Sequence, residues 1–353
     1  MSLFVVFKVL LLAAAAFVVA VSVAPILIRL LVRYKFGKNI RDEKETPVMH
    51  ALHAAKQGTP TGGGIVIWGT LVALILMSQA LAGIFGAHSY PGRLSFLDRG
   101  ETFLPLGALV AAAVIGLVDD YMNVKRIGGG KGGGLRARHR LLLYTAIATI
   151  GALWFYFKLD WDLLRIPLVG AFNIGWWYIP FFILVIVATS NSVNLTDGLD
   201  GLAGGCLLSS YAAMGAISFL QGKYDLATFC GVIAGAIAAF LWFNINPAKF
   251  FMGDTGAMSL GVTLGVVAML TNTSLLLPII GVIYVIESGS VIVQIAAKRL
   301  RHGRRVFLST PVHHHLEASG WKEPQIVMRF WLISGIAAVL GLVIELVDMG
   351  MIK

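Results

Sequence analysis

The sequence is poor in charged residues: Asp, Glu, Lys and Arg make up only 13% of its 353 residues, while hydrophobic residues make up 58%. This balance excludes an ordinary soluble domain. Cysteine is scarce as well, because Cys206 and Cys230 are the only two and both lie in apolar segments. The sequence therefore contains no disulfide framework and no zinc-ligand spacing. Its apolar runs are continuous and not alternating, which favours membrane-spanning helices over a barrel.

Ten apolar segments are long enough to cross a membrane as helices. They cover residues 4–31, 63–86, 101–118, 141–157, 176–190, 201–220, 226–243, 256–271, 274–297 and 327–347. The first is too long for a signal-peptide core, so we interpret it as a retained span. Pro278 is expected to break or kink the start of the ninth. The sequence thus predicts an all-α, polytopic integral membrane bundle of about ten transmembrane helices, with residues 1–353 forming a single domain.

The positions of the positive charges predict the orientation of this bundle. Most of the 28 lysines and arginines lie in the first, third and ninth loops. An excess of Lys and Arg marks the cytoplasmic side, so we place the odd-numbered loops in the cytoplasm and both termini in the periplasm. The net charge of +10 is then mostly a matter of topology, with a second use in attracting an anionic substrate or lipid. We expect no nucleic-acid partner.

Polar chemistry is concentrated in five segments, all on the predicted cytoplasmic side. Carboxylates, amides and histidines are costly near hydrocarbon and mark functional sites there, so we predict a membrane-embedded site for a charged substrate. A glycine-rich stretch at 128–134 lacks the ending of a phosphate-binding loop and is interpreted as a flexible linker. The five segments are Lys56–Gly64, Asp119–Lys125, Asn191–Gly201, Asn244–Gly256 and Pro311–Glu323.

Two of these segments carry candidate catalytic carboxylates. Asp119 and Asp120 end the third span, where they face an unfavourable helix dipole and repel each other unless a cation compensates. The alternative is a solvated helix end beside Lys125. Asp254 precedes the eighth span and is the best candidate for a metal ligand, since its hard oxygen lies beside a helix N-terminus that can bind an anion. The alternative for Asp254 is an N-cap.

The other segments offer groups suited to a nucleotide. Asn191, Asn194, Asp197 and Asp200 recur every third residue and share one face if the stretch is helical. Amides and carboxylates in such a row suit the hydroxyls and base edges of a nucleotide or a hydrated Mg²⁺, whereas a simple helix cap needs only one of them. In the string from Lys56 onward, a lysine, threonine hydroxyls and glycines suit phosphate contact, although the same residues also form ordinary turns.

Three consecutive histidines, His313, His314 and His315, complete the set. Adjacent residues on a helix point about 100° apart, so the three cannot all bind one metal from a regular helix. The helix geometry instead favours one or two of these histidines facing a phosphate as hydrogen-bond donors. Phe251 can stack on a base.

Together these strings resemble the phospho-N-acetylmuramoyl-pentapeptide transferase family, within the polyprenyl-phosphate N-acetylhexosamine-1-phosphate transferase superfamily. The resemblance runs from about residue 36 to residue 331, and the histidine triplet followed by Glu317 and Gly320-Trp321 is its most specific part. It rests on the strings KQGTPTGGG, GLVDDYMNV, NSVNLTDGLDGLAGG, LWFNINPAKFFMGDTG and PVHHHLEASGWKEPQIVMRFW.

The resemblance implies a ten-helix protein of the bacterial inner membrane with its active site facing the cytoplasm. It implies Mg²⁺-dependent transfer of phospho-MurNAc-pentapeptide from UDP-MurNAc-pentapeptide to the membrane lipid undecaprenyl phosphate, giving lipid I and UMP. Family members often work as homodimers. By matching position, Asp254 binds the metal, and the catalytic groups are Asp119, Asp120, Asp254 and His314. The substrate-binding residues are Lys56, Thr61, Asn194, Asp197, Asp200, Asn244, Phe251, His313 and His315.

Two positions depart from the family pattern. Gly62 stands where the family string GTPTMGG has methionine, and Ala257 stands where a serine usually follows the aspartate string. The first is expected to loosen the start of the second span, and the second removes a hydroxyl near Asp254. Neither removes a charged group.

Three other functions are compatible with parts of the sequence. A related transferase that uses UDP-N-acetylglucosamine would keep most of the same residues. A secondary transporter would need carboxylates at mid-membrane, but the acids lie at span ends, apart from Glu287. A prenyltransferase with paired aspartate-rich strings has only Asp119-Asp120 as a match.

Overall fold

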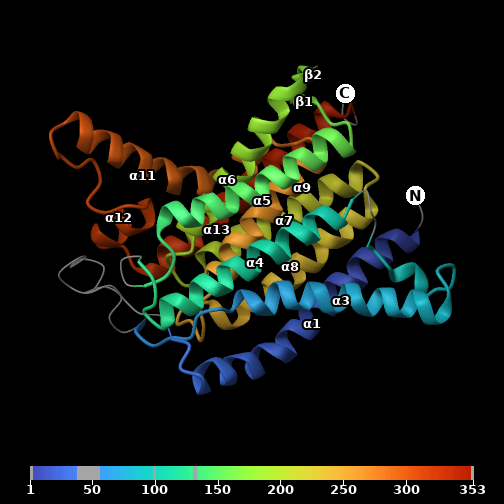
Figure 1. The fold of residues 1–353 in the computed structure, drawn as a ribbon, viewed down its shortest axis with the longest axis horizontal. Helices are drawn as coiled ribbons and strands as arrows, with labels where there is room; N and C mark the ends of the chain where they lie inside the picture. The colour runs from blue at the N-terminus through green and yellow to red at the C-terminus, as the bar shows by residue number, and fades with distance from the viewer. Residues whose placement is uncertain (1–2, 38–55, 98–100, 130–132, 351–353) are drawn as a thin grey trace.

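The computed structural model describes residues 3–37, 56–97, 101–129 and 133–350, which fold almost entirely into helices (Figure 1). Two short strands and two 3₁₀ turns interrupt the helical pattern. The long helices are α1 (Leu3–Arg33), α3 (Gly64–Phe85), α4 (Phe103–Val124), α5 (Ala137–Lys158), α6 (Tyr178–Thr196), α7 (Leu202–Leu220), α8 (Tyr224–Asn244), α9 (Asp254–Leu270), α11 (Val282–Leu300) and α13 (Glu323–Asp348). The short helices are α10 (Leu277–Ile280) and α12 (Val312–Ala318).

The predicted all-α membrane fold is confirmed. In the described part of the chain, 8 helices are long and apolar enough to cross a membrane. The two other predicted spans differ for identifiable reasons. The helix α9 has only 17 residues, and α11 carries Glu287, Lys298 and Arg299. The break expected near Pro278 separates α10 from α11 at Gly281.

The short helix α9 forms the centre of the bundle. At 1.5 Å per residue it is about 25 Å long, which is less than a typical hydrocarbon core of roughly 30 Å. This length is sufficient because every residue from Thr255 to Leu270 is buried, so α9 is covered by protein and not by lipid. It packs against α4, α6, α3 and α7.

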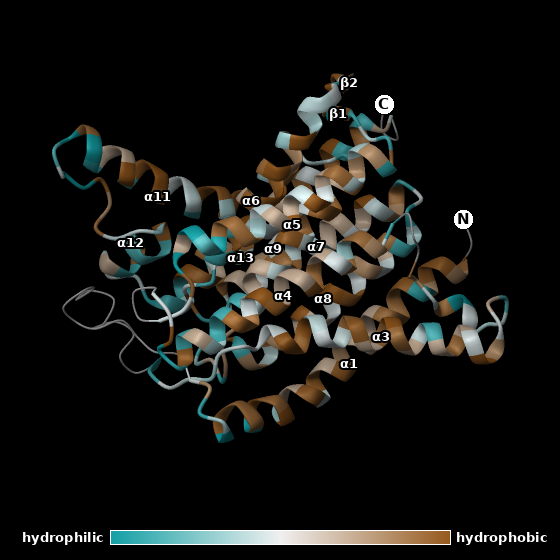
Figure 2. Ribbon diagram, in the orientation of Figure 1, coloured by the Kyte–Doolittle hydropathy of each residue, from teal (hydrophilic) through white to brown (hydrophobic). Residues whose placement is uncertain are grey.

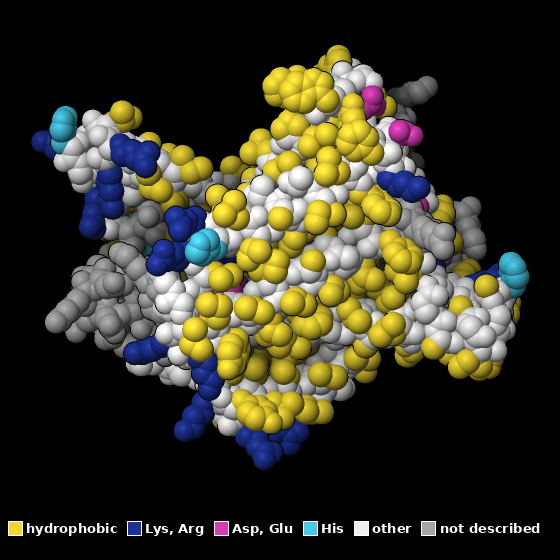
Figure 3. Space-filling model, in the orientation of Figure 1, with side chains coloured by type: hydrophobic (Ala, Val, Ile, Leu, Met, Phe, Trp, Pro, Cys, Tyr) yellow, Lys and Arg dark blue, Asp and Glu magenta, His cyan; other side chains and the backbone are white. Residues whose placement is uncertain are grey.

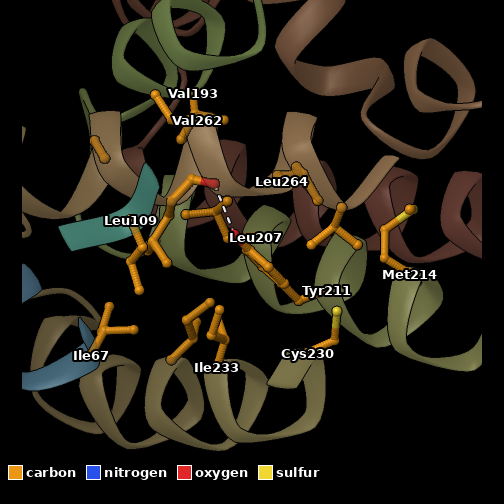
Figure 4. Packing of buried hydrophobic residues seen from close by; sticks show 14 of the residues in the cluster. Ile67, Leu109, Val193, Leu207, Tyr211, Met214, Cys230, Ile233, Val262 and Leu264 are labelled. Carbon is orange, nitrogen blue, oxygen red and sulfur yellow. Dashed lines mark hydrogen bonds between the residues drawn. The ribbon is translucent and has the colours of Figure 1, made fainter. Parts of the chain in front are cut away.

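Apolar side chains from all these helices meet around α9 (Figure 4). The hydroxyl of Tyr211 on α7 donates a 2.8 Å hydrogen bond to the Leu260 carbonyl of α9, which satisfies the polar end of a fully buried ring. The packed residues that Figure 4 labels include Ile67, Leu109, Val193, Leu207, Ile233 and Val262.

Polar residues occupy the two ends of the bundle and hydrophobic residues cover its length (Figure 2). The two chain termini lie on the same side of the bundle, opposite α12 (Figure 1). On the face drawn in Figure 3, Lys and Arg side chains gather mainly toward the end where α11 and α12 lie. This asymmetry agrees with the orientation predicted from the loops.

An antiparallel hairpin, β1 (Leu163–Ile166) and β2 (Gly170–Asn173), was not expected from the sequence. It is joined to α13 because Arg165 contacts Glu345 at 3.0 Å and Asp348 at 2.5 Å. Beside it, the ammonium of Lys223 donates to the Leu270 carbonyl and lies 5.2 Å from the Trp161 ring centre. Burial lowers the pKa of Lys223 below its usual range.

The crossing of α1 and α8 leaves no room for a side chain at Gly235. A Cβ there would lie 2.1 Å from the Ala13 carbonyl oxygen, whereas a Cβ at Gly231 would find its nearest atom at 3.4 Å. Small residues of this kind let membrane helices approach closely.

We therefore predict that Gly235→Ala lowers the stability of the protein by about 1–3 kcal/mol, because the two backbones must separate. Unfolding followed in detergent micelles measures the effect. Gly231→Ala is the matched control on the same helix and should change stability much less. Equal shifts for the two variants would contradict the close crossing.

Candidate functional site

Three carboxylates, Asp119, Asp120 and Asp254, meet where the end of α4 lies against the start of α9. The two helices are in close contact at Gly116, where an added Cβ would lie 2.5 Å from the Asp254 carbonyl oxygen. The side chains of Asp119 and Asp254 interact directly, and Asp119 and Asp120 are almost completely buried. We call these three residues, together with Arg140 and Asn194, the acid cluster.

Asp120 caps the central helix from outside it. Its Oδ1 accepts the backbone N–H of Asp254 at 3.0 Å, and its Oδ2 accepts that of Thr255 at 3.1 Å. These donors belong to the first turn of α9, which has no partner for them within the helix. The helix N-terminus also favours a negative charge. Asp120 therefore fixes the position of Asp254, and both of its oxygens are engaged.

Asp254 is held by two side chains from other helices. Asn194, near the end of α6, donates its amide to Oδ1 at 2.7 Å. Arg140, near the start of α5, donates to Oδ2 at 2.7 Å. The same Nη1 atom of Arg140 lies 3.3 Å from Oδ2 of Asp119. A single guanidinium thus lies between two of the three carboxylates and offsets their repulsion.

Asp119 is further held by the end of the glycine-rich stretch. The backbone N–H of Leu135 donates to its Oδ1 at 2.6 Å. Gly134 has a φ of +81°, and an added Cβ there would lie 2.7 Å from the same oxygen. Residues 130–132 of the predicted flexible linker lie outside the described part of the chain, and the hydrogen bond to Asp119 comes from Leu135, directly after its last glycine.

A second group of charges surrounds Lys56, just before α3. Its ammonium contacts Asp200 at 2.7 Å and Glu323 at 2.5 Å. Asn246 donates to Asp200 at 3.0 Å and to Glu323 at 3.3 Å, which joins the two acids. We call these four residues the lysine cluster. Glu323 begins α13, and its Oε1 also accepts the Asp200 N–H at 2.7 Å.

The segment from Asn194 to Gly201 connects the two clusters. The prediction that Asp197 and Asp200 share a helical face with Asn191 and Asn194 is wrong, because α6 ends at Thr196 and α7 begins only at Leu202. Gly201 has a φ of +81°, in the left-handed region where a turn is easy for glycine. The last turn of α6 places Asn194 on Asp254, and the turn after the helix places Asp200 on Lys56. Asp197 caps the end of α6.

Asn244 and Asn191 have different environments. Asn244 is buried at the end of α8, accepts the Gly201 N–H at 3.0 Å and donates to the Phe250 carbonyl at 2.8 Å. It thereby ties the turn to the segment before α9. Asn191 is exposed and donates to the Val187 carbonyl of its own helix.

The segment before α3 pairs with the segment before α9. Gly63 N–H donates to the Phe251 carbonyl at 2.7 Å, and Phe251 N–H donates to the Pro60 carbonyl at 2.7 Å. Thr61 is buried beside this pairing, and Phe251 is half-buried. Gly62 has a φ of +90°, a conformation that side chains rarely adopt, so this departure from the family string lies at a turn suited to glycine.

The three histidines lie on α12 and face different partners. Nδ1 of His313 lies 2.8 Å from Oε2 of Glu287 on α11, and both side chains are fully buried. Nδ1 of His314 lies 2.8 Å from Oε2 of Glu317 on its own helix. His315 is half-buried, and its Nδ1 accepts the Leu308 N–H at 3.2 Å.

Sequence reasoning missed Arg140, Glu323, Asn246 and Glu287 as members of these contacts. From the sequence, Arg140 is only one of the positive charges in the third loop that predict the orientation in the membrane. Glu323 lies at the edge of the histidine segment, where nothing in the string reveals that it contacts Lys56, which is 267 residues away. A possible signal for Glu287 was present: it is an acid inside an apolar span, which is costly unless it has a task.

Comparisons with known proteins show which family the sequence resembles. The sequence model of glycosyl transferase family 4 matches residues 102–272, which include all five residues of the acid cluster. A phospho-N-acetylmuramoyl-pentapeptide-transferase of Chloroflexus aggregans is 39% identical over 352 residues, covering 96% of this chain and 90% of its own length. One of Listeria welshimeri is 37% identical over 329 residues, covering 93% of this chain and 95% of its own.

The capping contacts of Asp120 generate a stability prediction. Asp120→Ala leaves two N–H groups of α9 without their acceptor, so we expect a loss of about 1–2 kcal/mol. Unfolding in detergent measures this loss. Asp119→Ala is the control, because it leaves the start of α9 capped and should lower stability less. A larger loss for Asp119→Ala would show that Asp120 is not the capping residue.

Proposed function

Because this chain belongs to the phospho-N-acetylmuramoyl-pentapeptide-transferase family, we propose that it transfers phospho-MurNAc-pentapeptide from UDP-MurNAc-pentapeptide to undecaprenyl phosphate. The products are lipid I and UMP. The chain is a phosphoglycosyl transferase with a multi-pass membrane fold. The observation that carries the finer proposal is the acid cluster, in which carboxylates from two helices share one guanidinium at one end of the bundle.

The site belongs to the cytoplasmic face of the bacterial inner membrane in this proposal. The excess of Lys and Arg in the odd-numbered loops supports that orientation. A site at the ends of membrane helices suits a reaction with one soluble and one lipid substrate. The donor approaches from the water, and the acceptor phosphate lies at the headgroup level of its own membrane. The homodimer stays a prediction, since a single chain does not test it.

The oxygens of the acid cluster fit Mg²⁺ chemically. Within the described residues no group of three His, Cys, Asp or Glu is arranged to hold a metal ion. Proteins commonly bind Mg²⁺ through only one or two carboxylates together with substrate phosphates. Asp254 and Asp119 are the residues that would hold it, because both direct an oxygen to the cationic Arg140. When bound, Mg²⁺ would neutralise charge on the donor diphosphate and on the leaving UMP.

The residues of the chain mainly position the reactants in this proposal. Exchange of one phosphoanhydride for another is nearly balanced in energy, so orientation and charge neutralisation dominate. The acceptor phosphate attacks the sugar-linked phosphorus, and the bond to UMP breaks. With a second pKa of roughly 6 for a phosphate monoester, the acceptor is mostly dianionic at neutral pH. Asp119 would orient this phosphate or accept the proton of the fraction that is still monoanionic, while Asp120 keeps Asp254 in place.

The donor pocket is proposed to follow the Asn194–Gly201 segment and its neighbours. Phe251 offers a ring for the uracil base. Lys56 and His314 offer positive or hydrogen-bonding groups to the diphosphate. The other residues assigned to this pocket are Thr61, Asn194, Asp197, Asp200, Asn244, His313 and His315.

Release of UMP from purified protein tests the function. We expect Mg²⁺-dependent release with UDP-MurNAc-pentapeptide and undecaprenyl phosphate, and little with UDP-N-acetylglucosamine. The reverse preference would assign the chain to the related N-acetylglucosamine-phosphate transferases. Flux across sealed vesicles without any UMP release would instead indicate a transporter.

The metal assignment has its own prediction. Asp254→Asn keeps the size of the side chain but removes its charge, so we expect turnover to fall by several orders of magnitude and the Mg²⁺ response to disappear. A titration of UMP release with Mg²⁺ measures both effects. Asp348→Asn, at the other end of the bundle, is the control. Near-normal, Mg²⁺-dependent activity of Asp254→Asn would remove this residue as the ligand.

A further inference from the structure

Glu287 is a buried acid in the first half of α11, among apolar residues. It is 0% exposed on α11, and its Oε2 lies 2.8 Å from His313 Nδ1. Among the described residues, its Oε1 has no hydrogen-bond partner. A buried carboxylate that is only half satisfied lowers stability. Such an acid is typical of a functional site when it lies within a membrane span.

His313, the partner of Glu287, is directed at the segment that connects the two clusters. It is 0% exposed, and its Nε2 also has no hydrogen-bond partner among the described residues. A Cβ added to Gly198 would lie 2.2 Å from this Nε2. Only a glycine leaves room for the imidazole there. This buried ring nitrogen therefore lies against the backbone between Asn194, which holds Asp254, and Asp200, which holds Lys56.

The contact with Glu287 determines the orientation of the His313 ring. The hydrogen bond to Glu287 is made by Nδ1 of the ring and not by Nε2. This contact fixes the ring orientation and directs Nε2 to Gly198. His314 differs, because its carboxylate partner Glu317 lies three residues away on the same short helix. His313 takes its orientation from another helix, α11.

We propose that Glu287 is a positioning residue of the transferase site. It holds the His313 ring against Gly198 and thereby fixes the Asn194–Asp200 segment, whose side chains hold Asp254 and Lys56. This inference rests on the proposed function, since it assumes that the donor occupies the space beside that segment.

A purely structural role makes a different prediction. If the pair only fastens α12 to α11, loss of either residue lowers stability, and the effects on activity follow from misfolding. If Glu287 acts through His313, its removal matters only while His313 is present. A double-mutant cycle separates the two roles, because residues that act as a unit give non-additive losses.

The experiment uses Glu287→Ala, Glu287→Gln, His313→Ala and the double alanine variant of the full chain. UMP release and unfolding temperature are measured for each variant. We expect Glu287→Ala to lower kcat/KM roughly 10–100-fold, as removal of an orienting partner usually does. Glu287→Gln keeps an acceptor for Nδ1 and should lose less than about fivefold. The double variant should be no worse than His313→Ala alone.

Two controls keep the test specific. Glu345→Gln removes another buried acid, at the opposite end of the bundle beside Arg165, and should lower the unfolding temperature without lowering kcat/KM. Calorimetry measures the affinity of the same Glu287 and His313 variants for UDP-MurNAc-pentapeptide, and this test does not depend on turnover. Non-additive loss of binding supports it, even if no UMP is released and the proposed reaction fails. Losses that multiply in the double variant, or equal losses for Glu287→Ala and Glu287→Gln, would overturn it.

Discussion

The structure depends on keeping Asp119, Asp120 and Asp254 together at the ends of membrane helices. At about 4 Å and an effective dielectric constant near 20, two carboxylates repel by about 4 kcal/mol. The compensating groups come from different helices: Arg140 from α5, Asn194 from α6 and the first N–H groups of α9. Repulsion within the acid cluster is therefore balanced only when these helices are correctly packed, so the fold and the site depend on one another.

The three acids of the cluster have different roles. Asp120 has both oxygens on the backbone of α9 and acts as part of the scaffold. Asp119 and Asp254 share Arg140, whose guanidinium occupies a position that suits any cation. A substrate-bound cation that reached these two acids would have to compete with Arg140. The side chain of Arg140 is about one-third exposed (31%), which leaves it room to move.

Much of the fold could be predicted from the sequence, because continuous apolar runs are a strong signal in a membrane protein. The convergence of the polar segments followed from their common place at the ends of spans. The individual contacts did not, since Lys56–Glu323 and Arg140–Asp254 join residues 267 and 114 positions apart and no local pattern encodes such pairs. The turn at Gly201 was missed for a different reason: a spacing of three residues suggests a helix even where glycines end it.

In the lysine cluster, as in the acid cluster, opposite charges are paired within the protein. Lys56 is already paired with Asp200 and Glu323, so an anionic donor must share or exchange these partners when it binds. Such prior pairing weakens the gross attraction for any passing anion, but it holds the ammonium in a defined position before the substrate arrives. For a reaction that is nearly balanced in energy, accurate placement of the two phosphates contributes more than tight binding. Pairing cations with internal acids therefore suits a site that has to release UMP as readily as it binds the donor.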